Sequence, residues 1–194
     1  MGIRFGKVED VAQILAIYAP YVENTAISFE YTVPTMEEFT KRFLDITAQY
    51  PWLVWEEQGQ VLGYAYGSAP FERAAFSWCA ESSIYLRADQ RGRGIGKKLQ
   101  LALEALLQMQ GYQLLYALVT TDNPASIAFH KALGFSYLAE FPGCGWKLEA
   151  WHGLVWLEKR LNPVQGVGNF PAALLELVDS DQKLSTILDK LSLS

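Results

Sequence analysis

The stretch from Ala80 to Lys98 joins a β pattern, a glycine-rich turn and the start of a long helix. Ser83 to Leu86 alternate polar and β-forming residues, which indicates a strand. From Ile95 the apolar residues recur at helical spacing, and the pattern ends at Gly111. Three glycines and two arginines fill the turn at positions 91–96. Such a turn aims several backbone N–H groups and the positive end of a helix dipole at one point. The stretch therefore predicts a site for a phosphate-bearing ligand.

Net charge restricts the class of partner. The 194-residue chain carries a net charge of −5, which disfavours nucleic acid or an anionic membrane as the main partner. Basic residues still cluster between Arg87 and Lys98, which suits a small anionic ligand. We find no apolar run long enough for a transmembrane helix and no signal peptide at the N-terminus. Cys79 and Cys144 are the only two cysteines and lie far apart in the sequence, so we expect a reduced, cytoplasmic protein; a disulfide between them is the alternative.

Strand and helix patterns alternate along the chain. We expect strands at residues 3–5, 52–57, 60–68, 76–86, 114–119, 135–141 and 153–161, and helices at 8–22, 35–50, 94–110 and 124–133. Thr35 and Glu38 predict a capping box. Glu81 and Ser82 interrupt an apolar strand, which favours a bulge there, and residues 142–145 predict a loop. The order β-α-α-β-β-β-α-β-α-β-β predicts an α/β (α+β) mixed sheet with helices on its faces.

The C-terminal part of the chain differs in composition from the rest. Residues 162–171 hold two prolines and two glycines and read as a linker. The apolar residues from Ala172 to Leu193 favour one or two short amphipathic helices. We therefore expect one domain at residues 1–162, followed by a linker and a C-terminal helical extension at 163–194.

Two motifs together point to a known family. Arg91-Gly92-Arg93-Gly94-Ile95-Gly96 resembles the acetyl-CoA signature of the GNAT superfamily of N-acetyltransferases, Arg/Gln-x-x-Gly-x-Gly/Ala. The segment from Asn123 to Phe135 resembles the second conserved helix of that family. Tyr50-Pro51-Trp52, Ala80-Glu81-Ser82 and Gly145-x-Lys147 resemble the phosphinothricin and methionine sulfoximine acetyltransferases within it. The resemblance covers about residues 3–161 and implies a mostly antiparallel sheet that is split at an acetyl-CoA cleft.

The resemblance implies acetyl-CoA as cofactor and no metal. Backbone groups of the strand before the loop would pair with the pantetheine arm, and one N–H would polarise the acetyl carbonyl. The loop would cradle the pyrophosphate; an ordinary turn with solvated arginines is the alternative. The cofactor-binding residues implied are Ile84, Tyr85, Leu86, Arg91, Gly92, Arg93, Gly94, Ile95, Gly96, Lys97, Asn123 and Ser126.

Two residues are candidates for proton transfer. Glu81 is the candidate general base, because an amine is protonated at neutral pH and must lose a proton to attack. Apolar neighbours such as Trp78 would raise its pKa, whereas the alternative is an ordinary surface glutamate. His130 occupies a position where many GNAT enzymes carry a tyrosine that protonates the leaving thiolate. An imidazole can do that or help to deprotonate the amine, and the alternative is a helix-surface histidine without a role.

In the residues for substrate recognition, this sequence differs from the subgroup that it resembles. Phe29, Arg73 and Phe76 resemble the substrate pocket of the subgroup, and the Arg73 fork suits a carboxylate or phosphinate. Lys147 and Trp151 would close the pocket, within one chain or across a dimer; the alternative is a salt-linked loop and a core tryptophan. The phosphinothricin enzyme has a lysine in place of Phe71 and a tyrosine in place of Phe76. These departures remove a cation and a hydroxyl, which favours a less anionic amine or a methionine derivative.

The sequence therefore predicts a homodimeric N-acetyltransferase that acts on the primary amine of a small amino-acid-like molecule. Two alternatives stay open. One is a different amine, such as a polyamine, a peptide N-terminus or an antibiotic. The other is a CoA-binding module without turnover, against which the intact Glu81 and His130 count.

Overall fold

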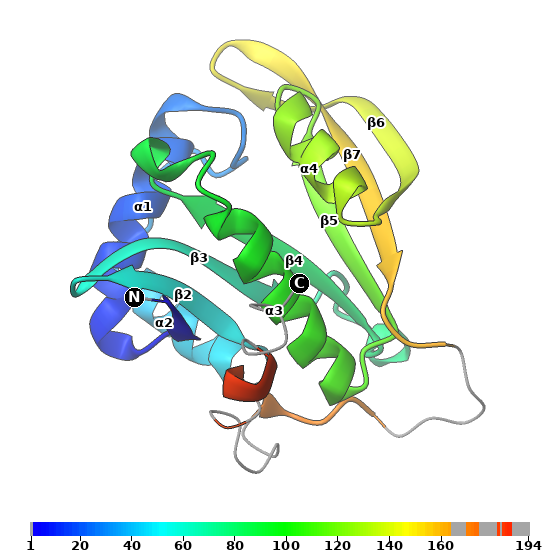
Figure 1. Ribbon diagram of the computed structural model, residues 1–194. Coiled ribbons are helices and arrows are strands. Elements are labelled where there is room, and N and C mark those ends of the chain that lie inside the picture. Colours follow the sequence, from blue (N-terminus) through cyan, green and yellow to red (C-terminus); the bar gives the residue numbers. More distant parts are fainter. Residues whose placement is uncertain (1, 164–169, 175–181, 183, 188–194) are drawn as a thin grey trace.

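The computed structural model describes residues 2–163, 170–174, 182 and 184–187. A seven-stranded sheet with the order β1-β2-β3-β4-β5-β7-β6 runs through this part of the chain (Figure 1). The strands are β1 (Gly2–Phe5), β2 (Trp52–Glu57), β3 (Gln60–Ser68), β4 (Cys79–Leu86), β5 (Leu114–Thr120), β6 (Ser136–Lys147) and β7 (Ala150–Arg160). The helices are α1 (Val11–Asn24), α2 (Met36–Thr47), α3 (Ile95–Gln110) and α4 (Pro124–Ala132). The predicted mixed α/β architecture and element order are confirmed.

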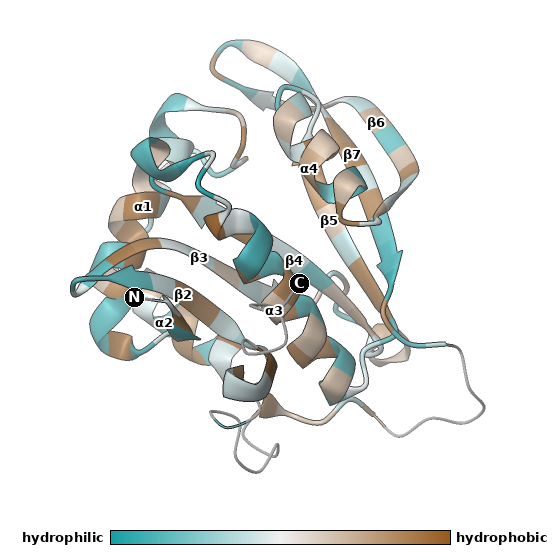
Figure 2. Cartoon of the chain, viewed as in Figure 1, coloured by the Kyte–Doolittle hydropathy of each residue, from teal (hydrophilic) through white to brown (hydrophobic). Residues whose placement is uncertain are grey.

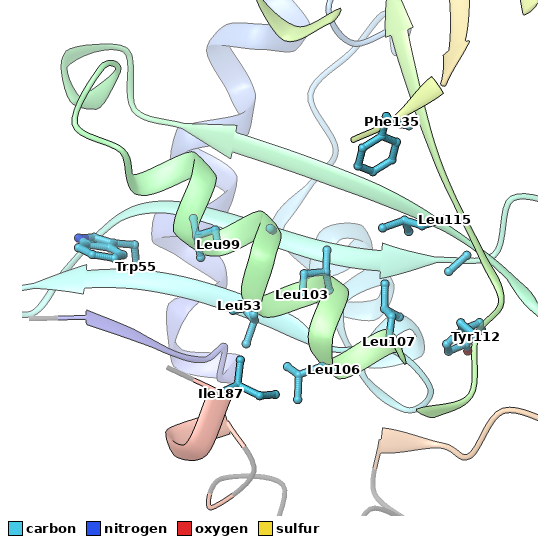
Figure 3. Close-up of a cluster of buried hydrophobic side chains, with 14 of the residues drawn as sticks. Leu53, Trp55, Leu99, Leu103, Leu106, Leu107, Tyr112, Leu115, Phe135 and Ile187 are labelled. Carbon is cyan, nitrogen blue, oxygen red and sulfur yellow. The ribbon is translucent and has the colours of Figure 1, made fainter. Parts of the chain in front are cut away.

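The helices cover both faces of the sheet. On one face, α3 packs against the sheet through Leu99, Leu103 and Leu107, all fully buried (Figure 3). On the other face, α1 and α2 pack around Trp52 and Tyr64 in a second cluster. Because side chains alternate along a strand, β2, β3 and β4 contribute to both clusters. The glycine-rich loop is largely hydrophilic, whereas hydrophobic and hydrophilic residues alternate along α3 (Figure 2).

β4 and β5 form the one parallel pair among the described strands, and they part after three residues. Cys79, Ala80 and Glu81 pair with Leu114, Leu115 and Tyr116. From Ser82 onward β4 stays paired with β3, while β5 stays paired with β7 through Thr120. The two halves of the sheet therefore diverge just beyond Glu81. This divergence is the split in the sheet that the resemblance predicts.

Three predicted details are wrong. β4 begins at Cys79 rather than at residue 76, because Ala74–Phe76 form a 3₁₀ turn. The expected bulge at Glu81 and Ser82 is absent, since the β3–β4 pairing continues through both residues. The expected loop at 142–145 lies inside β6, which tolerates a proline because it is the edge strand. The capping box of Thr35 and Glu38 is confirmed, with each side chain bonded to the backbone of the other residue.

The described residues beyond 163 pack on the domain. Phe170 stacks on Trp78, and the Ala172 N–H donates to the Gln110 carbonyl at the end of α3. Ile187 lies against α3 and joins the main hydrophobic cluster (Figure 3). Most of the predicted C-terminal helical extension lies outside the described residues, so its division from the domain stays a prediction.

Candidate active site

A cavity of about 420 Å³ lies between the end of β4, the glycine-rich loop and the first turns of α3 and α4. Gly92 and Gly94 adopt φ angles of +78°, a left-handed conformation that glycine adopts at little cost, and a Cβ at either would meet no atom within 4 Å. The loop therefore presents open backbone at the N-terminus of the 16-residue helix α3. Backbone N–H groups and a helix dipole at one point suit a phosphate group.

Most of the predicted cofactor residues line this cavity. They are Ile84, Leu86, Arg91, Gly92, Gly94, Ile95, Gly96, Lys97, Asn123 and Ser126. Arg93 points elsewhere, because its guanidinium forms an ion pair with Glu57 at 2.9 Å. Tyr85 lies on the opposite side of β4, where its ring contacts those of Tyr18 and Tyr21. The side chains of Arg93 and Tyr85 therefore do not join the other ten.

A narrow throat of about 60 Å³ lies where β4 and β5 diverge. It shares Ile84, Asn123 and Ser126 with the cofactor-side cavity. His130, which is 2% exposed, also lines it. The His130 Nδ1 lies 2.9 Å from the Ser126 carbonyl oxygen, while Nε2 is buried without a partner in the described structure. Burial lowers the pKa of His130, so the ring is neutral at pH 7.

Glu81 faces a third cavity, of about 360 Å³, on the other side of the throat. Ser83, Tyr85, Leu118 and Thr120 line both the throat and this cavity, so the two are contiguous. Burial raises the pKa of Glu81 from 4.5 to about 7. The Glu81 carboxyl group therefore gains or loses its proton near neutral pH, and a general base is most effective when its pKa lies near the working pH.

The loop after α1 forms the outer wall of the Glu81 cavity. Ser28, Phe29 and Glu30 line it, and Glu30 is held by an ion pair with Arg42 at 2.7 Å. Phe29 is thus the predicted substrate residue that shares a cavity with Glu81.

Lys147 at the end of β6 anchors this loop. Its Nζ donates to the carbonyl oxygens of Val22 and Ser28, both at 2.6 Å. The side chain is buried, and burial lowers its pKa. Lys147 lines none of the cavities described here, and its partners are two backbone carbonyls rather than the ion pair of the alternative prediction.

Arg73 and Phe76 line a separate cavity of about 310 Å³, away from the cavity that contains Glu81. Phe71 connects the two regions, because its ring lies 6.0 Å from that of Tyr116, the strand neighbour of Glu81. It also stacks on Trp156 at 5.7 Å. Phe71, Tyr116, Trp156 and Phe76 thus form an aromatic wall beside Glu81. Arg73 lies at the end of this wall that is away from Glu81.

Sequence reasoning missed two residues that the structure brings to the site. The Tyr21 hydroxyl accepts a hydrogen bond from Arg91 and donates to the Leu86 carbonyl, so it holds the lip of the cofactor-side cavity. Ile27 lies in an irregular segment without periodicity, so no pattern singles it out. Only the helical spacing of residues 8–22 hinted that Tyr21 faces inward.

The sequence is similar to a known protein family and to individual proteins of known activity. The family model described as acetyltransferase (GNAT) domain matches residues 3–156. The L-methionine sulfoximine/L-methionine sulfone acetyltransferase of Pseudomonas paraeruginosa is 38% identical over 168 residues, which cover 84% of this chain and 96% of that protein. The phosphinothricin N-acetyltransferase of Alcaligenes faecalis is 33% identical over 162 residues, with 82% of each chain covered.

A solved structure is similar as well. The phosphinothricin acetyltransferase of Sinorhizobium meliloti, in complex with acetyl-CoA, superposes with a TM-score of 0.81 at 34% identity. The match covers 88% of this chain and 92% of that chain. Among the described residues, no helix is long and apolar enough to span a bilayer, and no three His, Cys, Asp or Glu side chains are grouped to hold a metal ion.

Proposed function

The chain belongs to the GNAT acetyltransferase family, and on this basis we propose that it transfers the acetyl group of acetyl-CoA to the primary amine of a small amino-acid-like substrate. One observation carries the proposal. Glu81, whose pKa is raised to about 7, lines a cavity that a narrow throat joins to a glycine-lined phosphate cradle. The two reactants therefore reach the throat from opposite sides.

The residues of the cofactor-side cavity fit acetyl-CoA. Open backbone at Gly92 and Gly94 and the N-terminus of α3 would hold the pyrophosphate, with Arg91 and Lys97 beside it. The edge of β4 that faces the split is not paired with β5 beyond Glu81, so its backbone is available to the pantetheine arm. When bound, acetyl-CoA supplies an activated acyl group at the throat.

Glu81 acts as the general base in this proposal. An ammonium group is attracted into a cavity whose ionisable side chains include the carboxylates of Glu81 and Glu30. Glu81 accepts the proton of the amine, directly or through water, and the amine then becomes nucleophilic. Backbone N–H groups of β4 stabilise the negative charge that develops on the acyl oxygen.

His130 acts as a proton acceptor rather than a donor in the resting protein. The Nδ1 that faces the Ser126 carbonyl carries the hydrogen, which leaves a lone pair on Nε2. A neutral ring has no extra proton to give to a thiolate. We therefore propose that Nε2 accepts the proton that the amine nitrogen loses as the new N–C bond forms, and that it donates this proton to the CoA thiolate that leaves when the C–S bond breaks.

The aromatic wall beside Glu81 supports an uncharged substrate side chain. Phe71 packs between Tyr116, Trp156 and Phe76, so this position offers apolar contact and no cation. The sulfoximine or sulfone of a methionine derivative has low charge, unlike the phosphinate of phosphinothricin. We therefore propose a methionine sulfoximine or sulfone type of substrate. Arg73 lines a separate cavity, so its contact with the substrate carboxylate stays a prediction from the sequence.

A second copy of the chain is proposed as partner, in the cytoplasm. Large hydrophobic side chains of the β6–β7 hairpin are exposed, namely Tyr137, Leu138, Phe141, Trp146, Leu148 and Trp151. An exposed apolar surface of this kind is typical of an interaction site. Analytical ultracentrifugation of the full chain tests the homodimer, and a monomer at micromolar concentration contradicts it.

Release of free thiol from acetyl-CoA tests the function. The panel contains L-methionine sulfoximine, L-methionine sulfone, phosphinothricin, a polyamine and a peptide with a free N-terminus. We expect the two methionine derivatives to give the highest kcat/KM, with the N-acetylated product seen by mass spectrometry. Tight CoA binding without turnover of any amine would refute the enzyme and favour a CoA-binding module.

A further inference from the structure

Ile27 lies where the three cavities of the site meet. Among the described residues, it alone lines the cofactor-side cavity, the throat and the Glu81 cavity. Its side chain is half-buried and packs against the aromatic cluster beneath α1. Any group that passes from the first cavity toward Glu81 must therefore pass Ile27.

The sheet fixes two walls of the throat, and α4 with its N-cap contributes Asn123, Ser126 and His130. Ser82–Tyr85 of β4 are paired with β3, and Ala117–Thr120 of β5 are paired with β7. Neither backbone segment can move by itself without breaking its pairing to the neighbouring strand. Ile27 comes instead from the loop after α1, so its side chain sets the width that the splayed strands leave open.

Two anchors hold Ile27 in place. The Thr25 hydroxyl donates to the Tyr21 carbonyl at 2.6 Å and accepts from the Ile27 N–H at 3.1 Å. Lys147 binds the carbonyls of Val22 and Ser28, one on each side of this segment. The segment around Ile27 is thus bonded to α1 at its first end, and Lys147 of β6 binds it at both ends. The Ile27 side chain therefore has little freedom to move out of the throat.

We propose that Ile27 determines the acyl-chain length that the enzyme accepts. This inference rests on the proposed function and adds that the enzyme selects among acyl-CoA thioesters by the length of the acyl chain. The throat of about 60 Å³ is several times smaller than the cavities of about 420 Å³ and 360 Å³ on its two sides, so it is the place where a short acyl group is best distinguished from a longer one. Each further methylene of a propionyl or butyryl group collides with the Ile27 side chain, and shortening that side chain makes room for it.

The test compares wild type, Ile27→Val and Ile27→Ala with acetyl-CoA, propionyl-CoA and butyryl-CoA. Thiol release with one fixed amine gives kcat/KM for each thioester, and titration calorimetry gives each Kd. A methylene in a hydrophobic pocket changes kcat/KM by about 10-fold or more. We expect Ile27→Ala to raise the propionyl-to-acetyl ratio of kcat/KM by at least about tenfold, with Ile27→Val in between.

Ile46→Ala is the matched control. Ile46 is also half-buried and packs against the same aromatic cluster, but it lines none of the three cavities. The propionyl-to-acetyl ratio of kcat/KM of Ile46→Ala should equal that of wild type. An Ile27→Ala ratio equal to wild type, or an equal fall of kcat/KM for all three thioesters, overturns the proposal. If wild type turns over no amine, the proposed function fails, and the Kd values still decide whether Ile27→Ala favours the longer thioesters.

Discussion

Replacing Glu81 with glutamine should lower activity and raise stability at the same time. Burial raises the pKa of Glu81 to about 7, so the folded protein binds its proton more tightly than the unfolded chain, where the value is 4.5. Unfolding therefore releases a proton between these pH values, and this group makes the protein less stable as pH rises from 4.5 through 7. Glutamine keeps the shape of the side chain and cannot ionise, so it removes that loss.

The size of the effect follows from the pKa. One pKa unit corresponds to about 1.4 kcal/mol, so a rise from 4.5 to about 7 is equivalent to at most about 3 kcal/mol above pH 8. Near pH 4 the wild-type carboxyl is protonated in both states, and the two proteins should be equally stable. Loss of a general base should lower kcat/KM by about 100-fold or more at pH 8.

Urea denaturation at pH 4.5 and pH 8.5 measures the free energy of unfolding of both proteins. Thiol release from pH 5.5 to 9 measures kcat/KM, which should rise through about pH 7 for wild type and stay flat for Glu81→Gln. Glu23→Gln, at an exposed position on α1, is the control and should behave as wild type in both assays. A Glu81→Gln protein that gains no stability at pH 8.5 would contradict the raised pKa of Glu81, and one that keeps the rising limb of the pH profile would exclude Glu81 as the general base.

Three further substitutions test the phosphate cradle, the carboxylate partner and the loop anchor. Gly94→Ala and Gly59→Ala place a Cβ at φ +78° and +77°, where neither meets another atom, so both should lose about 1 kcal/mol in urea denaturation. Gly94→Ala alone should weaken the Kd of acetyl-CoA in calorimetry, and an equal Kd for the two variants would remove the loop from the cofactor site. Because Arg73 lines a cavity apart from Glu81, Arg73→Ala should leave KM nearly unchanged both for amino-acid substrates and for the matching decarboxylated amines; a rise of about tenfold for the amino acids alone would establish the carboxylate contact that the sequence predicts. Lys147→Met leaves two backbone carbonyls without their donor, which should cost about 1–3 kcal/mol in urea denaturation and raise the share of propionyl transfer. Unchanged acyl selectivity in that variant would separate Lys147 from the placement of Ile27.

Features that depend on a few neighbouring residues could be predicted from the sequence. The left-handed turn at Gly92 and Gly94 follows from backbone preferences, and the capping box at Thr35 follows from the reach of two short side chains. The interruption of β4 at Glu81 and Ser82 was visible too, but its interpretation as a bulge was wrong. The two polar residues alternate across a regular strand, where Glu81 faces its cavity and the Ser82 hydroxyl lies 3.3 Å from Gln100 beneath α3.

The tertiary structure alone decided how these pieces combine. The sequence placed Glu81 before the phosphate loop, but the throat between them exists because β4 and β5 part after three paired residues, a contact between segments more than 30 residues apart. The same holds for Ile27 and its anchor Lys147, which are 120 residues apart and carry no local pattern. The dihedral preferences of adjacent residues determine local conformation, whereas the width of a cavity depends on how residues that are distant in the sequence pack together. The sequence by itself therefore determined the chemistry available to this protein, and the packing of the α1 loop against the split sheet decided which molecules can reach it.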